Sequence, residues 1–430
     1  MQHVLSQPGE AITVDLTFQK YTLANGISLI VKENHHAQSV VVRGHVLGGA
    51  NLDGPERAGL ASFTANVMRR GTTRRTFAQI NETIESVGAS VYVNSGRYLT
   101  GFGGKSLAED FELLVEIMAD ILLTPTFPPE EVEKVRGQTI TGLKEAEDSP
   151  RSMAGRYFRE LLYGLDHPYG RSANGTLESI PRLSRDDLLA FYQQTFHPQD
   201  GAVVVVGDVN SQAVYDTLEA ALGQWQPGHP PPEIDVPEPA PLAEKVRYVH
   251  AMPNKSQADL VLGTVGPRRL DADFYAAEVG DTILGQLGLG GRIGLNVRDK
   301  EGMAYYARTS LSGNLGPSPW TIYAGVNPAN VDRAIDLIVA EVRRFRTEPV
   351  NEQELADAKA YLTGTLPLQL ESNEGVASLL LESHLYNLGD DFIARYPDLI
   401  NAVTAEEITA AAYKYLNDEV YALAIAGPYT

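Results

Sequence analysis

The chain has nine histidines and no cysteine, so histidine is the first residue type to consider for a metal or catalytic site. Two histidines four residues apart on a helix can bind one metal ion, but no pair of histidines here has that spacing. His35 and His36 are adjacent at a predicted turn, and His167 lies in the turn sequence DHPYG. Solvated histidines are common in turns, so the histidines alone predict no metal site in this chain.

A second candidate is the glycine-rich segment GQLGLGGRIG, which runs from Gly285 to Gly294. It lacks the Gly-Lys-Ser/Thr sequence of a phosphate-binding P-loop, and the net charge of −20 argues against binding of a nucleotide anion. Two interpretations remain for this segment. It is a loop that approaches the main chain of a ligand through Gly288, Gly290 and Gly291, or it is a structural turn.

Arg298 and Tyr305 follow this segment, seven residues apart, in the sequence RDKEGMAYY. Arginine is a permanent cation with planar donors, and a phenol donates a hydrogen bond without adding charge. Together they can hold a peptide carbonyl and stabilise the oxyanion that develops on it. The spacing by itself is weak evidence. The members of a Ser-His-Asp triad need not be close in sequence, but no Gly-x-Ser-x-Gly elbow supports one here.

The elements that must position these residues occur twice along the chain. The segments SRDDLLAFYQQTF, from Ser184, and TAEEITAAAYKYL, from Thr404, each begin with a hydroxyl N-cap and acidic residues in the first helical turn. Each leads into a short apolar strand that ends at glycine, and both pairs are offset by 220 residues. Two apolar helical stripes, at 111–121 and 335–345, are offset by 224 residues. These matches predict two homologous halves.

Residues 226–242 separate the halves and hold seven of the 25 prolines. Proline lacks an amide donor and restricts φ, so this stretch predicts an extended linker between domains at 12–225 and 243–430; a long surface loop within one domain is the alternative. Each half begins with strand patterns, such as NGISLIVKEN and ADLVLGTVG, and continues with helices. We therefore expect α+β domains with largely antiparallel sheets.

Charge narrows the classes of partner. The 35 Lys and Arg residues against 55 Asp and Glu residues predict no nucleic-acid or membrane-surface partner. No apolar run reaches the ~20 residues that span a bilayer, and the N-terminus lacks the pattern of a signal peptide. We expect a soluble, cytoplasmic protein, or a periplasmic one if an export signal has been removed.

Taken together, the motifs resemble the pitrilysin/insulinase family of zinc metallopeptidases, the inverzincins, and its shorter branch of bacterial and mitochondrial-processing-peptidase-like members. The resemblance covers nearly the whole chain. It implies two homologous α/β-sandwich-like domains that form half of a clam-shell. The motifs that carry it are NGISLIVKEN, GGANLDGPERAGLASFTANVMRRGT, EDSP, HPYG, FYQQTFHPQDGAVVVVGDV, the glycine-rich segment with RDKEGMAYY, and TAEEI.

Family members with a zinc site carry His-x-x-Glu-His on the helix after the GGA strand and a further glutamate ligand downstream. The resemblance places the first three of these positions on Ser62, Ala65 and Asn66. It places the downstream glutamate on or beside Gly142. Ser, Asn and Gly do not replace imidazole or carboxylate ligands of zinc, and alanine cannot act as the general base. The resemblance therefore implies no metal, no cofactor and no complete peptidase site in this chain.

The Arg–Tyr motif of the second half is intact. In the family an Arg and a Tyr seven residues later reach the zinc site of the opposed half and hold the substrate's carbonyl, and Arg298 and Tyr305 match them. The glycine-rich segment resembles the loop of the non-zinc subunit of mitochondrial processing peptidase. This combination implies a non-zinc subunit of a heterodimeric peptidase, inactive alone, with a homologous zinc-bearing partner and a peptide or unfolded polypeptide as substrate.

Two alternatives remain open. In the first alternative, the chain is a structural or peptide-binding member without a catalytic role, like the core proteins of a respiratory complex. In the second, it is a peptidase with an unrecognised second site. A core-protein-like role does not require Arg298 and Tyr305, so their presence favours the subunit hypothesis.

Overall fold

The structure is a computed structural model that describes residues 2–6, 11–226, 234, 236–287 and 290–429. The chain divides into two compact units, each built from three segments. Unit 1 comprises Met1–Gly142, Ser172–Asp235 and Leu366–Arg395. Unit 2 comprises Leu143–Arg171, Val236–Thr365 and Tyr396–Thr430. Each unit therefore takes chain from both halves of the sequence.

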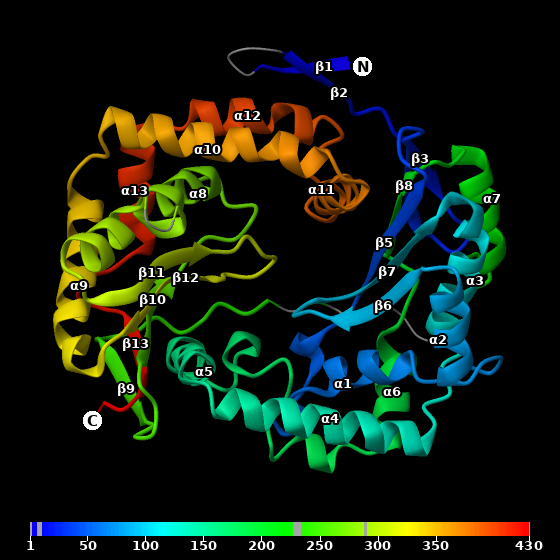
Figure 1. The fold of residues 1–430 in the computed structure, drawn as a ribbon, viewed down its shortest axis with the longest axis horizontal. Coiled ribbons are helices and arrows are strands. Elements are labelled where there is room, and N and C mark those ends of the chain that lie inside the picture. The colour runs from blue at the N-terminus through cyan, green and yellow to red at the C-terminus, as the bar shows by residue number, and fades with distance from the viewer. Residues whose placement is uncertain (1, 7–10, 227–233, 235, 288–289, 430) are drawn as a thin grey trace. The chain divides into compact units, whose positions relative to one another are not determined.

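Unit 1 contains a six-stranded mixed sheet in the order β3-β4-β8-β5-β7-β6 (Figure 1). Strands β4 and β8 are parallel, and the other neighbours are antiparallel. A separate antiparallel pair, β1 (Gln2–Ser6) and β2 (Ala11–Asp15), precedes it. The strands of the large sheet are β3 (Gln19–Thr22), β4 (Ser28–Glu33), β5 (Ser39–Leu47), β6 (Ser90–Ser95), β7 (Leu99–Leu107) and β8 (Ala202–Gly207).

Helices cover both faces of this sheet. A β-carbon placed on Gly104 of β7 would lie 2.7 Å from the side chain of Leu114, so α3 packs closely on that face. The next residue, Lys105, points to the opposite face, where its Nζ lies 2.6 Å from the carboxylate of Glu374 in α11. The helices that lie wholly or mostly in unit 1 are α1 (Leu60–Met68), α2 (Phe77–Ser86), α3 (Phe111–Leu123), α4 (Pro129–Glu147), α6 (Arg185–Thr195), α7 (Ser211–Leu222) and α11 (Asn373–Leu385).

Unit 2 contains a five-stranded mixed sheet in the order β11-β12-β10-β13-β9, in which only β13 and β9 are parallel among the described strands (Figure 1). Its strands are β9 (Val246–Ala251), β10 (Ala258–Val265), β11 (Ala304–Leu311), β12 (Pro319–Val326) and β13 (Ala422–Gly427). Its helices are α5 (Pro150–Tyr163), α8 (Phe274–Asp281), α9 (Val331–Thr347), α10 (Glu352–Leu370), α12 (Phe392–Ala402) and α13 (Ala405–Tyr415). Helices α4, α10 and α12 have residues in both units.

The two sheets have the same topology. Strands β4 to β8, taken in chain order, occupy the same places in their sheet as β9 to β13 do in theirs, and β3 is an additional edge strand. Helices α6 and α13 both have capping boxes, made by Ser184 with Asp187 and by Thr404 with Glu407. The expected fold class, two homologous α+β domains with largely antiparallel sheets, is confirmed.

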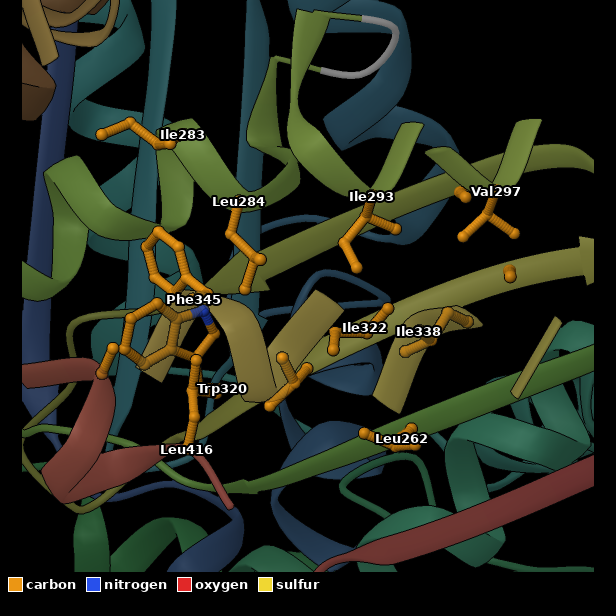
Figure 2. Packing of buried hydrophobic residues seen from close by; sticks show 14 of the residues in the cluster. Leu262, Ile283, Leu284, Ile293, Val297, Trp320, Ile322, Ile338, Phe345 and Leu416 are labelled. Carbon is orange, nitrogen blue, oxygen red and sulfur yellow. The ribbon is translucent and has the colours of Figure 1, made fainter. Parts of the chain in front are cut away.

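The core of unit 2 lies between its sheet and helices α8, α9 and α13. Figure 2 shows Trp320 of β12 beside Phe345 of α9, with Leu284 and Ile293 on the same side of the sheet. The buried indole donates a hydrogen bond from Nε1 to Oδ1 of Asp281, at 2.7 Å. This bond fixes the end of α8 on the sheet, immediately before the glycine-rich segment.

One helix of each sequence half packs on the sheet of the other half. Helix α5 comes from the first half and packs on β9, β10 and β13 in unit 2, whereas α11 comes from the second half and packs on β5 and β8 in unit 1. A β-carbon on Gly263 of β10 would lie 3.2 Å from the ring of Phe158, which shows how closely α5 approaches. The sequence repeat and the compact units therefore assign these helices differently.

The described residues of the proline-rich linker, 226, 234 and 236–242, form neither helix nor strand. Residues 227–233 and 235 lie outside the part that the structure describes. No helix in the described ranges combines the length and apolar character that crossing a bilayer requires.

Candidate functional site

Helix α1 keeps its position beside the sheet without side chains that could bind zinc. The carboxylate of Asp53 accepts hydrogen bonds from the backbone N–H groups of Gly59 and Ala61, at 2.8 and 2.9 Å, so the start of the helix is held in place. Gly59 has a φ of 91°, which favours glycine at this N-cap. The scaffold of the helix is therefore intact.

The three positions on α1 that the resemblance assigned to the zinc site have other environments. Ser62 is half-buried, and its hydroxyl donates a hydrogen bond of 3.4 Å to Oδ1 of Asn174. Ala65 is fully buried, and Asn66 is exposed. Gly142 of α4 is exposed, and a β-carbon there would meet no atom within 4 Å. Packing alone would accept a larger side chain at that position.

These residues do not fit a zinc ion. A hydroxyl, a methyl, an amide and a missing side chain supply neither the imidazole nor the carboxylate ligands that zinc prefers. In the described part of the chain, no three or more His, Asp or Glu side chains are grouped so that they could hold a metal ion.

Arg298 lies on a π-helical segment, η8 (Gly294–Lys300). Val297, the preceding residue, is buried in the core of unit 2, and its carbonyl accepts a 2.9 Å hydrogen bond from the N–H of Met303. Gly302 has a φ of 63° and donates from its N–H to the Arg298 carbonyl, at 3.1 Å. The guanidinium itself is exposed and has no ion-pair partner among the described residues. Short π-helical segments are rare and occur often at functional sites.

Tyr305 lies at a β-bulge. In the register of β11 with β12, Ala304 is opposite Val326 and Tyr306 is opposite Gly325, so Tyr305 is an extra residue without an opposite partner. Bulges interrupt the alternation of a strand and redirect a side chain. The Tyr305 side chain is 59% exposed, so its hydroxyl is accessible to a ligand. The bulge and η8 thus present a phenol and a guanidinium from elements joined by a short turn.

In the described part of the glycine-rich segment, the backbone packs closely against itself and against β11. A β-carbon on Gly291 would lie 2.6 Å from the Cα atom of Gly285, and one on Gly285 would lie 2.8 Å from the backbone nitrogen of Thr309. Gly290 has ordinary room, with its nearest neighbour at 3.5 Å. Gly288 lies outside the described residues. Packing therefore accounts for Gly291, and the predicted ligand-binding role of the three glycines stays a prediction.

Tyr306, the residue after Tyr305, is the centre of a polar cluster that the sequence analysis missed. Its hydroxyl donates a hydrogen bond to the buried carboxylate of Asp259 on β10, two strands away. Gln257 donates to both oxygens of the same carboxylate, at 3.1 Å each. Arg151 of α5 lies over the Tyr306 ring, 4.4 Å from its centre. Burial, and then the hydrogen bond to Asp259, raises the pKa of Tyr306, so its phenol stays protonated.

Gly325 of β12 makes this cluster possible. A β-carbon there would lie 2.4 Å from the Tyr306 ring and 2.3 Å from Nε2 of Gln257. The ring lies across the sheet at the point where β12 has no side chain. Adjacency to Tyr305 was the only sequence signal for Tyr306, and none pointed to Asp259, because the register of three strands brings the two together.

A buried carboxylate, Asp281, supports the same region from the core side. Its oxygens accept hydrogen bonds from Trp320, at 2.7 Å, and from the backbone N–H of Leu311 at the end of β11, at 3.2 Å. Burial raises the pKa of Asp281 to about 6, although these hydrogen bonds oppose the shift. The group thus links α8, β11 and β12 and titrates just below neutral pH.

Two family profiles match the chain. Residues 29–168 match "Insulinase (Peptidase family M16)", and residues 182–362 match "Peptidase M16 inactive domain". The chain therefore belongs to the M16 peptidase (insulinase) family, carries both its N-terminal and its inactive C-terminal domain, and is a homologue of M16 proteases. The expected family is thereby confirmed, and the assignment to a non-zinc subunit branch stays a proposal.

Similar proteins extend over almost the whole chain. An uncharacterized zinc protease of Mycobacterium leprae is 26% identical over 415 residues, which cover 95% of this chain and 91% of that protein. The uncharacterized zinc protease YmxG of Bacillus subtilis is 24% identical over 416 residues, covering 95% and 98%.

Solved structures share the fold. The crystal structure of a peptidase M16 inactive domain from Pseudomonas fluorescens superposes with a TM-score of 0.88 at 23% identity, covering 96% of this chain and 98% of that one. A protease from Helicobacter pylori gives a TM-score of 0.86 at 18% identity, covering 96% and 99%.

Proposed function

We propose that this chain is the non-zinc subunit of a heterodimeric M16 peptidase, and that it binds the carbonyl of a peptide substrate with Arg298 and Tyr305. The observation that carries the proposal is the bulge that leaves Tyr305 exposed next to the segment that bears the exposed Arg298. The side chains at Ser62, Ala65, Asn66 and Gly142 support it further, because they leave the chain without a zinc-binding set of its own.

The two side chains have complementary tasks. The Tyr305 hydroxyl donates a hydrogen bond to the substrate's carbonyl oxygen, and this bond strengthens as negative charge develops on that oxygen. The guanidinium of Arg298 carries its charge at all times, so it also attracts the carbonyl in the ground state. The zinc of a homologous partner subunit, when bound there, supplies the activated water; in the proposal the two chains enclose a chamber that admits peptides.

The turn between the two residues gives them a defined separation. Backbone hydrogen bonds from Glu301, Gly302 and Met303 return to the carbonyls of η8, at 3.2, 3.1 and 2.9 Å. Val297 anchors one side of this turn in the core. Catalytic donors act best when the protein holds them in place before the reaction, and this short, hydrogen-bonded turn meets that requirement.

The test is co-expression with each homologous chain from the same genome that carries His-x-x-Glu-His. We expect one such chain to copurify with this protein and the complex to hydrolyse peptides, while this chain alone does not. Hydrolysis by this chain alone would contradict the proposal. A stable complex that never hydrolyses peptides would instead support the structural or peptide-binding alternative.

A further inference from the structure

Strand β9 is an open edge of the unit 2 sheet, whereas the equivalent strand of unit 1 is covered. In unit 1, β3 pairs antiparallel with β4, and β4 has four successive buried residues. Strand β9 occupies the place of β4 in its own sheet, but among the described strands it pairs only with β13 (Figure 1). All six residues of β9 are exposed or half-buried. The place that β3 fills in unit 1 is therefore vacant in the described part of unit 2.

The hydrogen bonds of β9 show which of its residues face this open side. The N–H groups of Val246 and Met252 donate to carbonyl groups at either end of β13, at 3.0 and 2.7 Å. Backbone groups alternate in direction along a strand, so Arg247, Val249 and Ala251 face away from β13. Within the described residues, no hydrogen bond reaches the main-chain N–H or C=O groups of these three. A regular edge with free backbone groups is a template for an added strand.

Side-chain contacts hold this edge in place on both faces of the sheet. On the face that α5 covers, the ring of Tyr157 lies 4.4 Å from the ring of Tyr248 and 5.0 Å from that of His250, centre to centre. On the other face, the guanidinium of Arg247 donates a hydrogen bond of 2.6 Å to the hydroxyl of Tyr429. A strand that is fixed before binding loses less conformational freedom when a second strand pairs with it.

From this geometry we propose that β9 pairs antiparallel with β9 of a second copy of this chain, about a two-fold axis at Val249. In this register Arg247 of each copy is opposite Ala251 of the other, so all three outward-facing residues use both of their main-chain groups. Each arginine meets a small, uncharged residue, and no like charges are opposite each other. Tyr248 of each copy is opposite His250 of the other, which extends the aromatic group on the α5 face.

The self-complementary register favours a second copy over an unrelated strand, which would gain the main-chain bonds alone. Moving the axis by one residue loses part of the pairing. An axis at His250 places Arg247 opposite Pro253, which has no N–H to donate. An axis at Tyr248 places Ala251 opposite Lys245, which lies outside β9. The register about Val249 is the one that fits the strand as it stands.

This inference does not rest on the proposed function. Tyr305 lies on β11, which is the opposite edge of the same sheet. Pairing through β9 and binding of a peptide at Tyr305 therefore use different edges.

Analytical ultracentrifugation of the full chain over a range of concentrations tests the proposal. The salt concentration is about 0.15 M, so that repulsion between two chains of charge −20 is largely screened beyond ~8 Å. We expect an equilibrium between monomer and dimer. Ala251→Pro removes an outward-facing N–H from each copy, and the matched control Ala251→Ser keeps it. We expect Ala251→Pro to weaken dimerisation about ten-fold or more, and Ala251→Ser to change it by less than about two-fold.

Hydrogen exchange of the wild type at single-residue resolution is the second measurement, and it stands even if Ala251→Pro impairs folding. The N–H groups of Arg247, Val249 and Ala251 should exchange rapidly in dilute solution and slowly at concentrations where the dimer predominates. The N–H groups of Tyr248 and His250 face β13, so they should exchange slowly at both concentrations.

Any of four results would overturn the proposal. The first is a chain that stays monomeric up to about 0.5 mM, and the second is a dimer that Ala251→Pro leaves unchanged. The third is a dimer whose formation does not slow exchange at Arg247, Val249 and Ala251. The fourth is competition by a scrambled peptide as strong as that by a synthetic peptide of residues 246–251, because the edge would then accept any strand. None of these results depends on Arg298 or Tyr305, so the proposed function is tested separately.

Discussion

Tyr305 and Tyr306 are adjacent in the chain and have opposite environments. The bulge exposes Tyr305, whereas Tyr306 lies flat on the sheet and donates its hydroxyl to Asp259. One phenol is therefore available to a ligand, and the other is part of the structure that supports it. The comparison explains why residue type and spacing in RDKEGMAYY could indicate the pair Arg298 and Tyr305, but not the supporting cluster around Tyr306.

Replacing Tyr305 by Phe should lower the peptidase kcat of the assembled complex with little change in KM. The substitution removes one hydrogen-bond donor and keeps the ring, and loss of one such donor typically costs ~10²–10³ in rate. Tyr306→Phe is the matched control for removal of a hydroxyl, and we expect it to act through stability instead. Wild-type turnover by a complex carrying both Arg298→Ala and Tyr305→Phe would show that the pair has no catalytic role.

Purified alone, the chain should bind no stoichiometric zinc. Ser62, Asn66 and Gly142 offer no imidazole or carboxylate, so no tight four-coordinate site can form there. Elemental analysis after gel filtration in zinc-containing buffer measures this directly. About one zinc per chain that survives mild chelation would contradict the prediction.

Asp281 should make the stability of unit 2 depend on pH. Its pKa in the folded state is raised to about 6 from 3.8, so the folded state binds more protons than the unfolded state between these values. Stability from this group is therefore full below about pH 4 and is lost as the pH rises through 6, by about 3 kcal/mol in all. Asp281→Asn removes this dependence.

Urea unfolding at pH 4 and pH 7 measures the effect, with Trp320 fluorescence as a local probe in a Trp225→Phe background. The wild type should lose stability relative to Asp281→Asn as the pH rises over this range. A difference between the two proteins that stays constant from pH 4 to pH 7 would refute the assignment.

At the scale of elements, sequence patterns predicted individual helices and strands but could not determine how the two halves align residue by residue. The capping boxes of α6 and α13 and the strands β8 and β13 lie where the repeat placed them. The offset of 224 residues between the two apolar stripes differs from the offset of 220 between the first residues of α3 and α9. A shift of one helical turn leaves an apolar stripe almost unchanged, so periodicity alone could not determine the alignment.

Gly325→Ala should disrupt the site through the sheet. The added methyl group would overlap the Tyr306 ring, so the ring would have to move away from Asp259. Overpacking of this kind typically lowers the free energy of unfolding by about 1–3 kcal/mol. Thermal unfolding and peptide binding by the variant should both weaken. Gly142→Ala is the matched control, because a methyl group there meets nothing and alanine favours a helix. Equal stability of the two variants would contradict the role of Gly325.

At the scale of the whole chain, the repeat predicted two homologous α+β domains but not which helix covers which sheet. Strands β8 and β13 are apolar and buried throughout, which indicates cover on both faces. Sequence order would assign α5 to the first sheet and α11 to the second. The structure packs each on the other sheet. Helix patterns contain no signal for that exchange, because the buried residues of a helix do not specify which sheet they pack on. The boundaries at 12–225 and 243–430 stay a prediction about the repeat.

The exchange has a consequence for the separated halves. A fragment that ends at residue 225 contains β5 and β8 but not α11, so it would expose the apolar face that α11 covers, and a fragment from 243 lacks α5 in the same way. An exposed apolar sheet face leads to aggregation. We expect each fragment alone to be insoluble or only partly folded. We expect the two fragments to copurify when they are expressed together, and the pair to unfold at the same temperature as the intact chain. A fragment of either half that is monomeric, fully folded and cooperative in unfolding would show that its sheet does not need the helix from the other half.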